Sequence, residues 1–136
     1  MTFTLHTPKR LRLSNPRQHP ESDLQRRVAQ FWAAQYPATW AWTHHSPSGM
    51  AAASAKHAAI FVGLGMKKGV PDLMCYVRRG GYAGLALELK RDAKQNLTAE
   101  QQAWLILLES QGWRCGVFSS LLAVIDFLAD YHGKKT

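Results

Sequence analysis

Cysteine is scarce in this chain, which has two among its 136 residues. Cys75 and Cys115 lie too far apart in sequence to form a C-x-x-C metal or redox motif, and a domain of this length does not need a disulfide. We expect both to be reduced thiols in the core, because free cysteine is among the most buried residue types. A disulfide scaffold and a C-x-x-C site are therefore excluded.

Long hydrophobic runs are also missing. No uninterrupted apolar stretch approaches the ~20 residues that a membrane-spanning helix needs. The basic N-terminus, with Lys9, Arg10 and Arg12, has no apolar segment beside it of the kind that marks a secretory signal. We therefore expect a cytoplasmic protein without a membrane partner.

Acidic residues are also few in this chain. Nine Asp and Glu stand against seventeen Lys and Arg, which gives a net charge of +8 and an isoelectric point near 9.9. Residues 1–20 contain basic residues and no acid, and a second basic cluster lies between residues 66 and 94. Clustered positive charge is typical of proteins that bind nucleic acids. Solvated charge on an ordinary surface is the alternative.

The remaining composition, 46% hydrophobic and 19% charged, is that of a globular domain. Prolines at positions 8, 16 and 20 and the lack of periodicity indicate a basic N-terminal arm over residues 1–20. Residues 21–136 are predicted to form one domain.

Hydrophobic periodicity predicts the order of the elements. Helices are expected from Ser22 to before Pro37, over 51–61, from Thr98 to before Gly112 and from Ser119 to before Gly133, and strands over 39–45, 72–77, 82–90 and 113–118. The Gly-Gly turn within 78–81 makes the second and third strands an antiparallel hairpin, and a crossover helix makes the third and fourth parallel. The predicted fold class is α/β, a mixed β-sheet flanked by helices in the order αβ(α)ββαβα.

Three charged residues converge in this arrangement. Asp72 opens one strand of the hairpin, and Glu88 and Lys90 share one face at the end of the other. Antiparallel pairing brings the end of the second strand beside the start of the first, so Asp72 and Glu88 can share one cation. Hard oxygen ligands of this kind are those that Mg²⁺ prefers near substrate phosphates.

These residues resemble the motifs of the PD-(D/E)xK nuclease superfamily, and more closely those of its VRR-NUC family in the stand-alone form of viruses and bacteria. The resemblance covers about residues 21–132 and rests on four elements in order: Glu21 at a helix start, Gly65-x-x-x-Gly69-x-Pro71-Asp72-Leu73, Glu88-Leu89-Lys90, and Gln101 in a helix. It implies a restriction-endonuclease-like fold.

The resemblance also implies an activity, a Mg²⁺-dependent DNA endonuclease for which Mn²⁺ can substitute. Its expected substrates are branched DNA such as four-way junctions or flaps, in replication, repair or recombination. The expected metal ligands are Glu21, Asp72, Glu88 and the backbone carbonyl of Leu89, with Asp23 as the alternative helix acid. Lys90 and Gln101 complete the catalytic set, in which Lys90 holds or deprotonates the attacking water. A purely structural use of Gln101, as the capping-box partner of Thr98, is the competing interpretation.

Other residues are candidates for DNA contact. Five basic residues flank the two strands of the hairpin: Lys67, Lys68, Arg78, Arg79 and Lys94. His44 and His45 are adjacent in a predicted strand, so they face opposite sides and cannot chelate one metal together. The tryptophans fit core positions, although Trp40 and Trp42 lie near a strand end where they can be exposed.

Two other functions fit the same pattern. One is a DNA-binding module that keeps the fold without cutting, and the other is a sequence-specific restriction-type endonuclease. We expect a homodimer, because one set of Asp72, Glu88 and Lys90 cuts one strand at a time and paired incision needs a second copy. Nicking by a monomer is the alternative.

Overall fold

The computed structural model describes residues 20–46 and 55–133, apart from the side chains of Pro20, Glu21 and Ala55. The predicted basic arm lies outside these residues, except that Pro20 begins the first helix. The elements in chain order are α1 (Pro20–Gln35), α2 (Pro37–Trp40), β1 (Thr43–His45), α3 (Ala55–Gly63), β2 (Leu73–Cys75), β3 (Leu85–Leu89), α4 (Ala99–Ser110), β4 (Arg114–Phe118) and α5 (Leu121–Tyr131).

The sheet has four strands in the spatial order β1-β2-β3-β4. β1 pairs antiparallel with β2, and β2 pairs antiparallel with β3. β3 pairs parallel with β4, with Leu85 opposite Arg114 and Leu89 opposite Phe118. The predicted hairpin, the parallel crossover unit and the mixed sheet are therefore confirmed.

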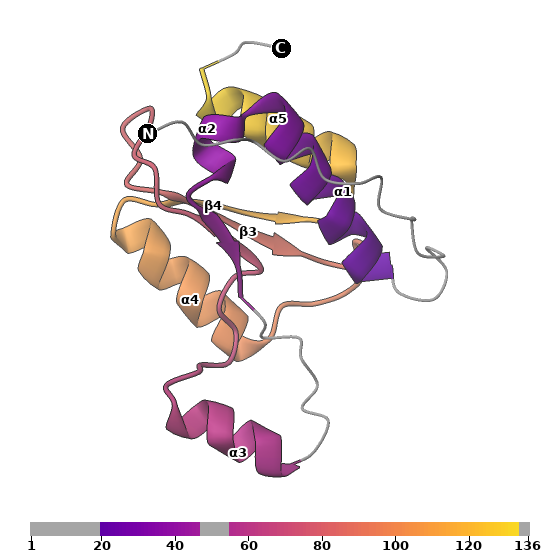
Figure 1. Cartoon of the computed structure of the whole chain (residues 1–136), viewed down its shortest axis with the longest axis vertical. Helices are drawn as coiled ribbons and strands as arrows, with labels where there is room; N and C mark the ends of the chain where they lie inside the picture. The colour runs from indigo at the N-terminus through magenta and orange to yellow at the C-terminus, as the bar shows by residue number, and fades with distance from the viewer. Residues whose placement is uncertain (1–19, 47–54, 134–136) are drawn as a thin grey trace, which may run out of the picture.

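Helices cover both faces of the sheet (Figure 1). Leu85, Leu87 and Leu89 of β3 pack in one core cluster with Val28 of α1 and Leu128 of α5. The intervening residue Ala86 belongs to a second cluster with Met74 of β2 and Leu108 of α4. This alternation confirms the predicted face of the three leucines, and it places Glu88 and Lys90 on the side of α4.

The prediction of a strand over residues 39–45 was wrong in its first half. Pro37 stands at the start of a short helix, a position that suits its fixed φ angle, and only Thr43–His45 form a strand. The Thr39 hydroxyl accepts a hydrogen bond from Trp32 Nε1 at 2.9 Å. Trp40 packs against the core cluster, whereas Trp42 is 68% exposed, so the alternating tryptophans do not mark one strand face.

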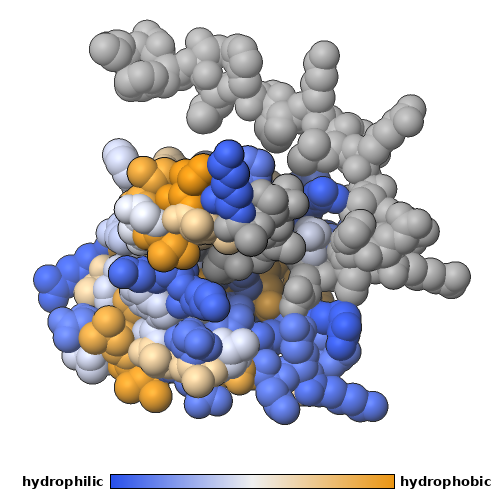
Figure 2. Space-filling model, turned by 90° about the horizontal axis from the view of Figure 1, so that it is seen from below, coloured by the Kyte–Doolittle hydropathy of each residue, from blue (hydrophilic) through white to orange (hydrophobic). Residues whose placement is uncertain are grey.

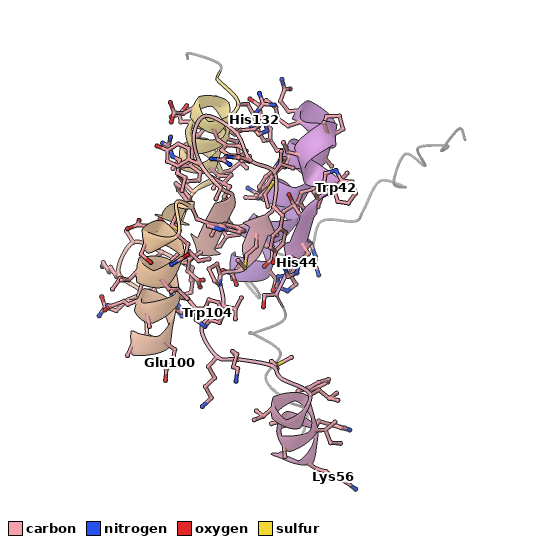
Figure 3. All side chains as sticks on the ribbon, turned by 90° about the vertical axis from the view of Figure 1, so that its left-hand side faces the viewer. Trp42, His44, Lys56, Glu100, Trp104 and His132 are labelled. Carbon is pink, nitrogen blue, oxygen red and sulfur yellow. The ribbon has the colours of Figure 1, made fainter. Side chains whose placement is uncertain are left out.

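α3 projects away from the layered body of the domain (Figures 1 and 3). Hydrophobic surface is exposed at this end of the molecule (Figure 2), and Ile60, Val62 and the following Leu64 are between 50% and 80% exposed. None of the helices in the described ranges has the length and apolar character that crossing a membrane requires.

Candidate active site

The register of the hairpin brings Asp72 beside Glu88. Leu73 of β2 lies opposite Leu87 of β3, so the residue before the first and the residue after the second are neighbours at one end of the pair. The Leu89 backbone N–H donates a hydrogen bond to Asp72 Oδ2 at 2.7 Å. The start of β2 is thus tied to the end of β3 through a carboxylate, as the hairpin argument predicts.

Glu88 is 3% exposed, and its two carboxylate oxygens have different surroundings. Oε1 accepts a hydrogen bond from Gln101 Nε2 at 2.9 Å. Oε2 is buried and has no hydrogen-bond donor among the described residues. Burial, followed by the negative charge of Asp72, raises the pKa of Glu88 to about 8. Loss of the Glu88 proton therefore leaves two carboxylates facing each other at low solvation.

Lys90 and Gln101 complete the cluster. Lys90 is 4% exposed, and its Nζ donates to Gln101 Oε1 at 2.7 Å. The same oxygen accepts from the Thr98 backbone N–H at 2.9 Å, which closes the predicted capping box at the start of α4. One side-chain amide therefore caps α4 and contacts both Lys90 and Glu88, so the structural interpretation of Gln101 does not exclude the functional one.

Gly69 fixes the loop that precedes Asp72. Its φ angle is +81°, in the left-handed region, and an added Cβ would lie 2.5 Å from the Glu100 carbonyl carbon and 2.6 Å from the Gln101 nitrogen. Trp104 Nε1 also donates to the Lys68 carbonyl at 3.0 Å. Because only glycine permits both the angle and this close approach, the loop packs directly against the first turn of α4.

Two acids near the start of α1, Glu21 and Asp23, are candidates for the helix acid. Glu21 lies in the first turn of α1, but its side chain is not among those described. Asp23 is buried and forms an ion pair with Arg27 at 3.0 Å. In the described part of the chain, no three Asp, Glu, His or Cys side chains gather at metal-ligand distance. Asp23 Oδ1, like Glu88 Oε2, is buried without a hydrogen-bond partner among the described residues, so Glu21 and Asp23 both stay candidates for the helix acid.

The donor set fits a hard divalent cation. Asp72 and Glu88 supply anionic oxygens on one side of the sheet, and Glu88 Oε2 is a buried acceptor without a donor. A cation between the two carboxylates would remove both the repulsion and the unsatisfied acceptor. Oxygen ligands without thiols or imidazoles favour Mg²⁺ or Mn²⁺.

The candidate DNA-contacting residues lie at both ends of the hairpin. Lys67 and Lys68 are exposed in the loop that leads to Asp72, and Lys94 is exposed in the loop after β3. Arg78 and Arg79 are exposed at the Gly-Gly turn, at the opposite end from the carboxylates. Arg79 donates to the His132 carbonyl at 3.2 Å, so part of its hydrogen-bonding capacity is used within the fold.

The two histidines of β1 face opposite sides, as predicted. His44 Nε2 hydrogen-bonds Tyr76 Oη at 3.0 Å, and the two rings stack. His45 Nδ1 lies 2.9 Å from the Asp72 carbonyl oxygen. Sequence reasoning missed this second contact, which depends on the β1–β2 register and has no local signal.

Comparison with known proteins agrees with the geometry of the candidate site. The family model of the VRR-NUC domain matches residues 19–121. A solved structure described as a VRR_NUC domain protein is similar with a TM-score of 0.70 and 28% sequence identity. The similarity covers 83% of this chain and 88% of that one. No curated protein matches the sequence.

Proposed function

The chain belongs to the VRR-NUC family of nucleases, and from that premise we propose that it is a metal-dependent DNA endonuclease that hydrolyses phosphodiester bonds. The observation that carries the proposal is the cluster of Asp72, Glu88 and Lys90, in which the buried Glu88 and Lys90 both contact the amide of Gln101. Burying Glu88 beside a second, half-buried carboxylate costs stability. A module that only binds DNA would gain nothing from that cost.

In this proposal Asp72 and Glu88 hold Mg²⁺ or Mn²⁺, with the Leu89 carbonyl and the helix acid of α1 as further ligands. The ion, when bound, acts as a Lewis acid that offsets charge on the phosphate and activates water. The Asp72–Leu89 hydrogen bond holds the first acid, and the Gln101 amide holds the second. Both carboxylates are thus oriented before substrate binds, which supports a site built for electrostatic preorganisation.

Lys90 positions the attacking water and the scissile phosphate. Its ammonium group has three donors, and Gln101 Oε1 takes one of them. Donors directed at the phosphate stabilise the negative charge that develops during hydrolysis. We therefore assign Lys90 a role as a positioned charge, with Gln101 fixing its direction.

The proposed substrate is branched DNA, such as a four-way junction or a flap. The net charge of +8 and the exposed Lys67 and Lys68 beside the site support binding to the phosphate backbone, which carries no base sequence information. Binding of this kind favours selection by DNA shape over selection by sequence. The sequence-specific restriction-type enzyme is the second candidate.

We also propose that the chain works as a homodimer. An isolated helix of nine residues is marginal in water, yet α3 has this length and exposes Ile60 and Val62. A second copy packed against this exposed face would bury it and bring a second active site to the same DNA.

Cleavage of a matched set of substrates tests the proposed function. A four-way junction, a flap and a linear duplex of shared sequence are incubated with the wild-type chain in Mg²⁺, in Mn²⁺ and in EDTA. We expect cleavage in either metal, none in EDTA, and faster cleavage of the branched substrates. Equal rates on all three would remove the structure selectivity, and binding without cleavage in both metals would favour the non-catalytic module.

A further inference from the structure

A cavity of about 350 Å³ opens between α1 and β1. Among the described residues, its lining includes Ser22, Gln25, Arg26, Ala29 and His45. The four α1 residues have the spacing of one helix face, and this face differs from the one that buries Val28 and Trp32 in the core. Neither Asp72 nor Glu88 lines the cavity, so it is separate from the carboxylate cluster.

The lining is suited to an anion. Arg26 contributes a guanidinium group, Gln25 an amide and Ser22 a hydroxyl, and each of these groups can donate hydrogen bonds. None of these five described lining residues is acidic. Arginine matches the geometry of a phosphate through two parallel N–H donors, so a phosphate group is the anion that this lining fits best.

His45 connects the cavity to the candidate active site. A carbonyl oxygen only accepts hydrogen bonds, so His45 Nδ1, at 2.9 Å from the Asp72 carbonyl, is the donor. His45 lies opposite Leu73 in the sheet and therefore on the side of α1, whereas Glu88 lies on the side of α4. Asp72 thus belongs to the carboxylate cluster through its side chain and contacts the cavity residue His45 through its backbone carbonyl.

We propose that this cavity is a phosphate subsite that binds one backbone phosphate of the DNA strand, adjacent to the phosphodiester that is cut. The inference rests on the proposed nuclease function, and it adds a second anchor on the opposite side of Asp72. With Arg26 holding one phosphate, the next phosphodiester along the strand is directed to Asp72 and Glu88. The subsite therefore sets the position of the cut relative to the bound strand.

Removing the negative charge of one DNA phosphate at a time tests this inference. A series of cleavable substrates carries one uncharged methylphosphonate at each position flanking the cut site in turn. We expect the wild-type rate to fall about tenfold at one flanking position, because one charge-assisted contact is lost. Arg26→Gln is expected to cut the native substrate about tenfold more slowly and to be insensitive to the substitution at that position.

Two further variants control the measurement. Lys56→Gln removes one positive charge from the exposed end of α3, far from the cavity (Figure 3), and is expected to remain as sensitive as the wild type. Arg26→Lys keeps the charge without the paired donors, and is expected to restore part of the rate. If Arg26→Gln responds to the methylphosphonates as the wild type does, or if no flanking position affects the wild type, the subsite is refuted.

DNA binding measured in EDTA, where no cleavage occurs, tests this inference separately from the proposed function. In EDTA, loss of one phosphate contact reduces the slope of log affinity against log salt by about 0.9, and weakens binding of duplex DNA roughly eightfold at 0.1 M salt. We expect this change for Arg26→Gln and not for Lys56→Gln. This binding measurement supports or refutes the subsite even if the wild-type chain cuts no DNA. An unchanged slope for Arg26→Gln, with its melting temperature unchanged, would also overturn the proposal.

Discussion

Gln101 Oε1 lies 2.7 Å from Lys90 Nζ and 2.9 Å from the Thr98 backbone nitrogen. One oxygen therefore serves both the cap of α4 and the orientation of the buried lysine. Through its nitrogen the same amide also reaches Glu88. The first turn of α4 is thus a structural part of the candidate active site, and its capping and its chemistry can be separated by substitution.

Gln101→Ala removes both functions, whereas Thr98→Ala removes only the side-chain cap. We expect each to lose about 1 kcal/mol of stability, the usual cost of a lost helix cap. Gln101→Ala is expected to lose a further 10-fold or more in kcat, because Lys90 and Glu88 lose their common partner. Thermal unfolding and single-turnover cleavage of both variants check this. Equal kcat values for the two variants would leave Gln101 with a capping role alone.

Glu88→Gln is expected to stabilise the metal-free protein near pH 8. The pKa of Glu88 is about 8 in the folded chain, above its ordinary value of 4.5, so the folded state holds this proton more tightly than the unfolded state does. Stability therefore falls as pH rises from 4.5 to 8, and Glu88→Gln is expected to remove that fall.

Melting curves in EDTA from pH 5 to pH 9 measure this effect. The variant is expected to melt a few degrees above the wild type at pH 8 and close to it at pH 5. A wild-type melting temperature that rises across this window, with the variant following it, would show that Glu88 is not the group responsible.

Metal binding is expected to release a proton below pH 8. The raised pKa keeps Glu88 largely protonated at pH 7, and a cation displaces that proton because it binds the carboxylate. Affinity for Mg²⁺ should therefore rise with pH up to about 8 and then level off. Calorimetry in two buffers of different ionisation enthalpy counts the protons released. No proton release at pH 7 would argue against Glu88 as a ligand.

Gly69→Ala is expected to be damaging at a site where a single methyl group is added. The left-handed φ angle and the 2.5 Å approach to the α4 backbone leave no room for Cβ, so the loop must move away from α4. We expect a loss of more than 2 kcal/mol in stability, together with reduced cleavage. Gly63→Ala is the matched control, because an added Cβ there meets nothing within 4 Å.

Val62→Glu is expected to disrupt the proposed dimer. Val62 is 62% exposed on the projecting α3, and a charge there opposes burial against a second copy. Leu122→Glu, on α5 and 76% exposed, is the control. Light scattering should give twice the single-chain mass of 15.2 kDa for the wild type and the control, and the single-chain mass for Val62→Glu. A wild-type chain that stays monomeric, free and with junction DNA bound, would refute the dimer.

Much of the site could be predicted from the sequence because it depends on local pairing. Consecutive strands joined by a Gly-Gly turn pair antiparallel, so the proximity of Asp72 and Glu88 follows from strand order, although the β2–β3 register is offset by one residue from the Arg79–Tyr82 pair at the turn. The spacing of Thr98 and Gln101 likewise predicts the cap of α4 before its contact with Lys90 is known. These relationships hold over short distances in sequence.

The errors lie where distant segments decide the outcome. Residues 39–42 alternate like a strand, but Tyr36 stacks on His132 with ring centroids 3.7 Å apart, and Thr39 Oγ1 hydrogen-bonds His132 Nε2 at 2.8 Å. These contacts with the C-terminal end of α5 lie beyond the reach of a local pattern. The contact between His45 and Asp72, and with it the cavity beside α1, is hidden for the same reason.

The most direct test of the account is the single-turnover cleavage rate of Asp72→Asn in saturating Mg²⁺. Asparagine can still accept the Leu89 hydrogen bond, so the fold is retained, but it removes the negative charge that would hold the cation. Asp92→Asn, in an exposed turn, is the matched control. We predict a rate at least 1000-fold below the wild type, as an order of magnitude for loss of a metal site, with DNA binding retained and the control unchanged. Cleavage by Asp72→Asn at the rate of the control would contradict a metal site at Asp72 and Glu88.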